Sequence, residues 1–151
     1  LEKRIEHHPG NIVMSKSLEV MGTHAGLPFY TIGQRHLGAV VEGHNQIAKG
    51  ETRPLYVLDK KIDTNELVVG FEDDVLLYKK NVEVEKMHWI SGQEPVFPLE
   101  CSVRLRHRQP LQKAVAQSNH IQFEQPQKAV TSGQYAVIYK DGNCLGGGAI
   151  I

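Results

Sequence analysis

Apolar and β-branched residues occur along the chain in short runs separated by residues that favour turns. Such runs are typical of β-strands, and little of the chain repeats with the helical period of about 3.6 residues. The runs in the first half that we interpret as strands are 11–14, 18–21, 29–32, 55–58 and 66–69. Residues 63–65 favour a hairpin between the last two runs. Residues 1–8, before Pro9-Gly10, and residues 73–78, which begin with acids, fit short helices instead.

The second half carries further short runs of strand type at regular spacing, which favours a small barrel or a sandwich. These runs are 82–84, 87–90, 102–109, 113–117, 120–124, 128–131, 135–139 and 149–151. Asp141-Gly142 is a strong signal for a two-residue hairpin turn. We place a domain boundary after Tyr78, which predicts one domain over residues 1–78 and a second over residues 79–151.

The composition is that of an ordinary globular protein, with 40% hydrophobic residues and a net charge of zero. No run approaches the roughly 20 apolar residues that span a bilayer, and no signal segment opens the chain, so we expect a cytoplasmic protein with no membrane partner. Cys101 and Cys144 are far apart and form no CxxC motif, which argues against a disulfide framework or a zinc site. The eight histidines form no known ligand pattern, and we expect no metal.

One strip of the chain is locally basic. No acidic residue lies between Cys101 and Gln122, and the strip holds Arg104, Arg106, Arg108 and Lys113. If residues 102–109 form one strand, the three arginines share one face at intervals of about 6.6 Å. Guanidinium groups in such a row suit the phosphates of a nucleic acid, because arginine binds phosphate oxygens in a bidentate manner. Alternatively, the arginines face water and pair with acids of a neighbouring strand.

The sequence contains no recognised catalytic motif. No GxSxG elbow is present, and Gly146-Gly147-Gly148 is not followed by the helix that a phosphate-binding loop requires. These glycines instead indicate a strand with unusual φ or close backbone approach. A thiol such as Cys101 within a strand is more typical of a core residue than of a nucleophile.

Four segments, in order, resemble signature segments of the tRNA-specific 2-thiouridylases and together cover nearly the whole chain. They are Gly22-Thr-His-Ala-Gly-Leu-Pro-Phe-Tyr-Thr-Ile-Gly-Gln-Arg35, Leu105-Arg-His-Arg-Gln109, Pro126-Gln-Lys-Ala-Val-Thr-Ser-Gly-Gln134 and Asn143-Cys-Leu-Gly-Gly-Gly-Ala-Ile150. The resemblance implies a mainly β fold, a small central β domain followed by a C-terminal six-stranded-type β-barrel. It also implies that the chain corresponds to these last two domains of the enzyme.

The enzyme implied by the resemblance is a sulfurtransferase that installs sulfur at position 2 of the wobble uridine of tRNA. Its N-terminal PP-loop domain uses ATP with magnesium, its catalytic cysteines relay sulfur, and a sulfur-donor protein supplies it. The Ser-Gly-Gly-x-Asp-Ser motif of that domain is absent from this sequence. We therefore expect no catalytic residue and no cofactor in this chain, which alone should be inactive.

The resemblance also implies a tRNA-binding set. Arg106 and His107 take the place of an Arg-Tyr pair that contacts tRNA in the family, and Gln134 takes the place of a tRNA-contacting glutamine. With the basic strip, the expected tRNA-binding residues are Arg104, Arg106, His107, Arg108 and Gln134, acting on the backbone of the anticodon-arm region. Two alternatives belong to other classes: a β-barrel module for protein–protein contact with acidic partners and no RNA role, and a free-standing enzyme that uses histidines and a metal.

Overall fold

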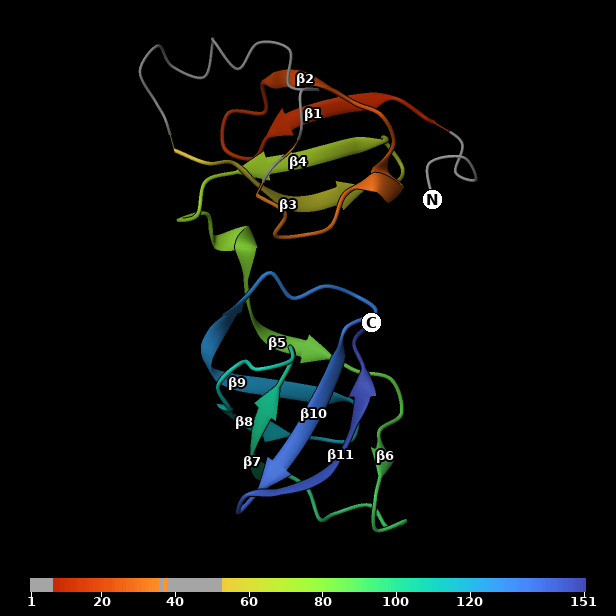
Figure 1. Ribbon diagram of the computed structural model, residues 1–151, viewed down its shortest axis with the longest axis vertical. Helices are drawn as coiled ribbons and strands as arrows, with labels where there is room; N and C mark the ends of the chain where they lie inside the picture. Colours follow the sequence, from red (N-terminus) through yellow and green to blue (C-terminus); the bar gives the residue numbers. More distant parts are fainter. Residues whose placement is uncertain (1–6, 36, 38–52) are drawn as a thin grey trace. The chain divides into compact units, whose positions relative to one another are not determined.

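The computed structural model describes residues 7–35, 37 and 53–151 (Figure 1), so most of the helix predicted over residues 1–8 lies outside the described residues. The chain divides into two compact units, Leu1–Leu77 and Tyr78–Ile151. Both units consist mainly of strands, as the predicted mainly β class requires, and the described residues of the first unit also form two short turns of 3-10 helix. None of the described residues belongs to a helix that is long and apolar enough to cross a bilayer.

The first unit contains a four-stranded sheet in the order β2-β1-β4-β3. Its strands are β1 (Gly10–Met14), β2 (Val20–His24), β3 (Tyr56–Lys61) and β4 (Glu66–Gly70). β1 pairs in parallel with β4, and the other neighbours are antiparallel. The strand predicted over residues 11–14 and the hairpin over residues 63–65 are confirmed. The strand predicted over residues 18–21 begins later, because Leu18 has a φ of 59° and belongs to the preceding turn.

The strand predicted over residues 29–32 is wrong. Residues Leu27–Phe29 form one turn of 3-10 helix, η2, with Pro28 near its start, where the fixed φ of proline favours a helical turn. The short helix predicted over residues 73–78 is a single 3-10 turn, η4 (Val75–Leu77). Asp74 lies before it, accepts a hydrogen bond from the backbone N–H of Leu76 at 3.0 Å and another from the Ser15 hydroxyl.

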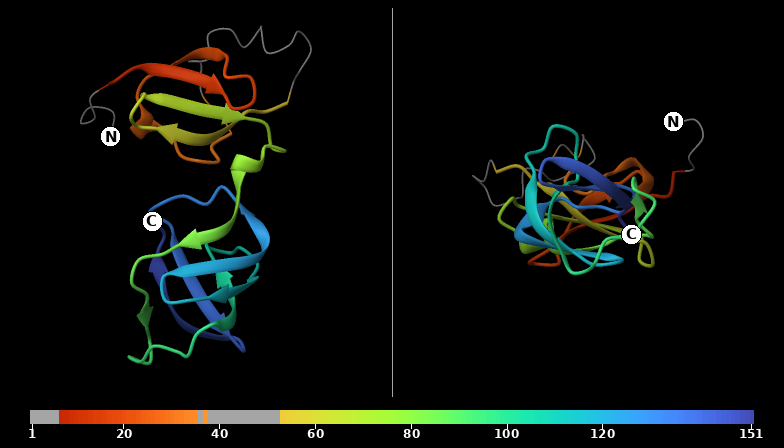
Figure 2. Two further views of the ribbon diagram at one scale, coloured as in Figure 1. Left: turned by 180° about the vertical axis from the view of Figure 1, so that it is seen from behind. Right: turned by 90° about the horizontal axis from the view of Figure 1, so that it is seen from below.

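The second unit is one seven-stranded antiparallel sheet in the order β5-β9-β8-β7-β10-β11-β6 (Figure 2). Its strands are β5 (Tyr78–Glu83), β6 (His88–Trp89), β7 (Leu99–Arg104), β8 (Gln112–Ala116), β9 (His120–Lys128), β10 (Tyr135–Lys140) and β11 (Asn143–Ala149). The Asp141-Gly142 hairpin joins β10 to β11, as predicted. The separate strand predicted over residues 128–131 is wrong, because β9 runs on to Lys128 and the next residue, Ala129, has a φ of 53° and belongs to a turn.

This sheet curls until its ends meet. Val84, just after β5, forms an antiparallel bridge with Ile150, just after β11. The N–H of Glu85 donates to the carbonyl of Ala149 at 2.8 Å, and the N–H of Ile151 donates to that of Glu83 at 3.2 Å. Six strands, from β5 through β9, β8, β7 and β10 to β11, therefore form a ring, and β6 pairs with β11 alongside this closure. The barrel-type second domain is confirmed.

The glycine run of β11 permits close backbone approach, as the sequence predicted. A Cβ on Gly146 would lie 2.1 Å from the carbonyl oxygen of His88, and one on Gly147 would lie 2.2 Å from that of Ala136. The barrel interior is filled by buried apolar side chains, of which Phe123 is the largest that is fully buried. The outward faces of the strands are thus left to carry polar side chains.

Candidate nucleic-acid interface

The three arginines do not form a row on one strand. β7 ends at Arg104, and the residues that follow form a turn in which Arg108 has a φ of 62°. The strand predicted over residues 102–109 is therefore wrong beyond Arg104. The reason is Gln109: its side-chain carbonyl oxygen accepts hydrogen bonds from the N–H groups of Leu105, at 3.0 Å, and Arg106, at 3.2 Å. Its own N–H donates to the carbonyl of Arg106 at 3.1 Å, which closes the turn.

The basic turn, which we define as residues 105–109, is fixed to strand β9 through buried glutamine contacts. The Gln109 amide nitrogen donates to the side-chain oxygen of Gln127 at 3.1 Å. Gln127, only 5% exposed, donates to the carbonyl of Gln125 at 2.8 Å and to the side-chain oxygen of Gln112 at 3.4 Å. Buried amides with satisfied partners hold one geometry, because breaking any contact leaves an unpaired polar group. The basic turn is thus a positioned feature of the barrel.

Arg106 provides a second anchor for the basic turn. Its Nη2 atom donates to the carbonyl oxygens of Lys128, at 3.1 Å, and Ala129, at 2.6 Å. These carbonyls lie at the end of β9, where Ala129, the residue after the strand, has a left-handed φ of 53°. The side chain is otherwise exposed. Arg106 therefore holds the turn in place and still presents positive charge to solvent.

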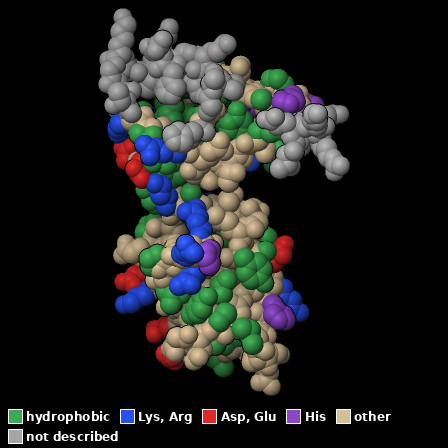
Figure 3. Space-filling model, in the orientation of Figure 1, with side chains coloured by type: hydrophobic (Ala, Val, Ile, Leu, Met, Phe, Trp, Pro, Cys, Tyr) green, Lys and Arg blue, Asp and Glu red, His purple; other side chains and the backbone are tan. Residues whose placement is uncertain are grey.

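His107 and Arg108 form the exposed tip of the basic turn. Within the part of the chain that the structure describes, neither side chain has a hydrogen-bond or ion-pair partner. Figure 3 shows Lys and Arg side chains gathered with a His on the face of the barrel unit in view. The alternative in which the arginines pair with acids of a neighbouring strand is not observed among the described residues. The tip can therefore receive an anion.

Arg104 lies apart from the tip, on the outer face of β7. It is half-buried, and its guanidinium carbon lies 5.5 Å from the centre of the Tyr139 ring, within the range of a cation–π contact. Its Nε atom is buried and has no hydrogen-bond partner among the described residues. Arg104 thus belongs to strand β7, whereas Arg106 and Arg108 belong to the turn that follows, so the single row predicted from the sequence is not formed.

Gln134 builds a turn. Its side-chain oxygen accepts a hydrogen bond from the N–H of Thr131 at 3.1 Å, and its own N–H donates to the carbonyl of Thr131 at 3.3 Å. Gly133 has a φ of 84°, which favours glycine at this position. The turn then pairs with the end of the chain: Gly133 donates to the carbonyl of Ile150 at 2.9 Å, and Ile150 donates to that of Gln134 at 2.8 Å. Among the described residues the amide nitrogen of the Gln134 side chain has no hydrogen-bond partner, so it is left for a ligand.

The first unit contains the same turn. Thr31 donates its N–H to the side-chain oxygen of Gln34 at 3.0 Å, Gln34 donates its N–H to the carbonyl of Thr31 at 2.9 Å, and Gly33 has a φ of 84°. Gly33 and Gln34 pair with the backbone of Val57 at 2.8 and 3.0 Å. Sequence reasoning interpreted residues 131–134 as a turn but missed that residues 31–34 repeat the same Thr-x-Gly-Gln pattern.

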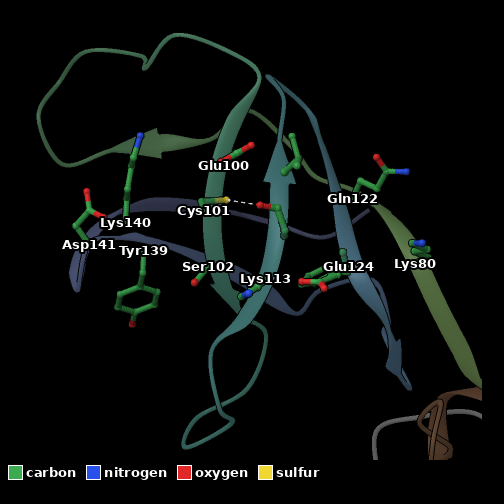
Figure 4. Close-up of a pocket in the computed structure, with 13 residues that line it drawn as sticks. Lys80, Glu100, Cys101, Ser102, Lys113, Gln122, Glu124, Tyr139, Lys140 and Asp141 are labelled. Carbon is green, nitrogen blue, oxygen red and sulfur yellow. Dashed lines mark hydrogen bonds between the residues drawn. The ribbon is translucent and has the colours of Figure 1, made fainter.

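A hollow of about 740 Å³ crosses the outer face of β9, β8, β7 and β10 (Figure 4). Sequence reasoning did not find it, because its walls come from residues far apart in the chain. Its charged lining consists of Lys80, Lys113, Lys140, Glu100, Glu124 and Asp141. At its floor the Cys101 thiol donates to the carbonyl of Ala114 at 3.6 Å, and burial raises the pKa of this thiol above its ordinary value. Cys101 is thus a neutral packing residue. Among the described residues, no three His, Cys, Asp or Glu side chains are grouped to hold a metal.

Comparisons with known proteins agree with this division into two β units. Residues 1–71 match the family described as the tRNA methyl transferase PRC-barrel domain, and residues 79–150 match the aminomethyltransferase β-barrel domain. The tRNA-specific 2-thiouridylase MnmA of Coxiella burnetii (strain RSA 493 / Nine Mile phase I) is 41% identical over 152 residues, covering 94% of this chain and 40% of the relative.

Two further relatives carry the same name. The MnmA of Vesicomyosocius okutanii subsp. Calyptogena okutanii (strain HA) is 40% identical over 146 residues, covering 93% of this chain and 39% of the relative. That of Methylococcus capsulatus (strain ATCC 33009 / NCIMB 11132 / Bath) is 37% identical over 158 residues, covering 99% and 41%. The chain spans about 40% of the length of the curated relatives that it matches. It belongs to the family of the tRNA-specific 2-thiouridylases, of which it represents the PRC-barrel and β-barrel domains.

Proposed function

We propose that this chain is the tRNA-binding part of an ATP-dependent enzyme that places sulfur at position 2 of the wobble uridine. In this proposal the parent enzyme acts in the cytoplasm, uses ATP with magnesium in a domain outside this sequence, and receives sulfur from a donor protein. The names of the relatives support the reaction, since each is called a tRNA-specific 2-thiouridylase. In this proposal the present chain binds the tRNA and contributes no catalytic residue.

The single observation that carries the proposal is the basic turn. Its tip presents His107 and Arg108 without a partner among the described residues, while Arg106 and Gln109 fix the turn to the barrel. Because the backbone of the turn is already held in place, a phosphate that binds Arg108 restricts the side chain but does not have to order the loop. Contacts of this kind position an RNA without reading its bases.

The five predicted residues take different roles in this proposal. Arg108 and His107 bind phosphate oxygens of the anticodon-arm region directly. Arg106 orients the turn and adds charge, and Gln134 donates from its amide nitrogen. Arg104 acts beside Tyr139, on the outer face of the barrel.

Salt-dependent binding of this chain to a tRNA transcript tests the proposal. Each phosphate contact that is removed reduces the magnitude of the slope of log K against log[salt] by about 0.9 for a B-form duplex or about 0.7 for a single strand. We expect Arg108→Ala to reduce the slope by about one contact, whereas the control Lys86→Ala, which removes an exposed charge outside the turn, should leave it unchanged. If the chain does not bind the tRNA, or if Arg108→Ala leaves the salt slope unchanged, tRNA binding would be assigned to another part of the enzyme.

A further inference from the structure

We propose that the hollow on the outer face of the barrel binds one unpaired nucleotide, whose base stacks on Tyr139 and whose phosphate meets Lys113. This inference rests on the proposed function, since it adds a second RNA contact to the barrel unit. It assigns a binding role to residues outside the basic turn.

The register of the sheet builds the floor of the hollow. Tyr139 lies opposite Ser102, and Ser102 lies opposite Lys113, on the adjacent strands β10, β7 and β8. Neighbouring strands are about 4.8 Å apart, so the three side chains follow one another across the sheet (Figure 4). They point outward, because the alternate residues Val103, Ala114 and Ile138 are buried in the core.

The order of side-chain sizes along this row leaves space for a planar nucleobase. Ser102 is small and lies between the larger side chains of Tyr139 and Lys113, which stand as walls. Tyr139 is half-buried, and Arg104 lies over its ring at 5.5 Å, which limits the orientations that the ring can take. A restrained aromatic ring at the side of an open hollow is a suitable platform for a nucleobase, because stacking does not depend on the identity of the base.

The charges of the hollow favour a nucleotide over a simple polyanion. Three lysines, Lys80, Lys113 and Lys140, are balanced by three acids, Glu100, Glu124 and Asp141. None of the six forms an ion pair among the described residues. A nucleotide offers phosphate oxygens to the lysines, and its exocyclic amino groups and ribose 2′-hydroxyl are donors that carboxylates accept.

The hollow also continues from the basic turn. Arg104, which packs on the Tyr139 ring, is the last residue of β7, and the next residue is Leu105 of the basic turn. Ser102 lies two residues earlier on the same outward face, about 6.6 Å along the strand. An RNA strand whose phosphates lie on the turn can therefore place its next unpaired nucleotide in the hollow.

Binding of a single-stranded RNA pentamer with 2-aminopurine at its centre tests this inference on the same 151-residue chain. We expect the fluorescence to be quenched on binding, the Kd to rise about tenfold in Tyr139→Leu, and Tyr139→Phe to retain both quenching and affinity. Ser102→Phe, which fills the hollow, should weaken binding, whereas Ser102→Ala and Lys86→Gln should not. Circular dichroism of each variant confirms folding. Tyr139→Leu and Ser102→Phe perturb the hollow independently, so either one decides the test if the other fails to fold.

The outcomes separate this inference from the proposed function. Quenching and affinity that Tyr139→Leu leaves unchanged would overturn the inference, even where Arg108→Ala still weakens tRNA binding. A peptide of alternating Lys and Glu that binds in a Tyr139-dependent manner, with no pentamer binding, would make the hollow a protein site and overturn it as well. If pentamer binding depends on Tyr139 while tRNA binding is unchanged in Arg108→Ala, the result would support nucleotide binding in the hollow and refute tRNA binding by the basic turn.

Discussion

Replacing Arg106 by lysine separates the charge of the basic turn from its anchoring. The Arg106 guanidinium reaches two carbonyl oxygens at the end of β9, at 3.1 and 2.6 Å. A lysine ammonium keeps the charge but lacks the planar fork that spans two acceptors. Hydrogen bonds that involve a charged group contribute about 1.5–3 kcal/mol net, and the exposure of this side chain reduces that contribution to about 1 kcal/mol.

The free energy of unfolding should therefore fall by about 1 kcal/mol in Arg106→Lys, which lowers the urea midpoint by roughly 0.5–1 M. Trp89, the one tryptophan of the chain, is buried in the barrel and reports its unfolding selectively. The same energy corresponds to about a fivefold loss of tRNA affinity if a loosened turn must be ordered again on binding. The salt slope should stay the same, because the charge is kept.

Arg108→Lys is the matched control, because it makes the same chemical change at a side chain without a partner among the described residues. Its urea midpoint should equal that of the wild type. If Arg106→Lys unfolds at the same urea concentration as Arg108→Lys and binds tRNA as tightly as the wild type, the two carbonyl contacts do not anchor the turn. The structural basis of the proposed function would then be refuted.

Three further predictions follow from the geometry of the barrel. Gly147→Ala should lower the unfolding free energy by about 2–3 kcal/mol, because its Cβ would meet the Ala136 carbonyl oxygen at 2.2 Å; unchanged urea unfolding would contradict this. Gln134→Glu should keep the turn but weaken tRNA binding, because it keeps the acceptor oxygen and loses the amide donor; equal affinity in a filter-binding assay would exclude a contact from that nitrogen. Because burial raises the pKa of the Cys101 thiol, the stability it contributes is complete below the ordinary thiol pKa of about 8.5 and is lost as pH rises above it. Iodoacetamide at pH 8 should alkylate exposed Cys144 first, and mass spectrometry that finds Cys101 modified equally fast would refute its burial.

The strands that sequence predicted correctly are those whose ends carry strong local signals. The turns at 63–65 and 141–142 consist of residues that favour hairpins, and the apolar alternation on either side fixes which strands they join. At these two hairpins the turn residues and the pairing of the strands favour the same structure, so a short segment of sequence is sufficient to predict it. The same holds for the glycines of β11, where the need for close backbone approach could be predicted from the residues alone.

The predictions that failed share a different cause. Residues 29–32 and 102–109 have the composition of strands, but near the end of each segment a glutamine side chain accepts hydrogen bonds from backbone N–H groups and produces a turn. The glutamines are Gln34, two residues after the first segment, and Gln109, the last residue of the second. The pattern of hydrophobic and polar residues does not predict such a hydrogen bond, because the bond depends on one side-chain oxygen atom and not on which face of a strand is polar. The identities of the candidate binding residues could thus be proposed from sequence, whereas their arrangement depended on contacts to β9 more than 20 positions away.

The repeated Thr-x-Gly-Gln turn changes what the signature segments mean physically. In each unit the glutamine oxygen closes the turn, and the glycine takes a φ of 84°. The turn then pairs with the backbone of a residue distant in sequence, Val57 of β3 in the first unit and Ile150, just after β11, in the second. In the barrel this pairing lies next to the Val84–Ile150 bridge that closes the ring. A glutamine in these segments is therefore required by the closure of the fold whether or not it contacts tRNA. In the proposed function, contacts with tRNA then depend mainly on side chains that the fold does not use, and at the basic turn these are His107 and Arg108.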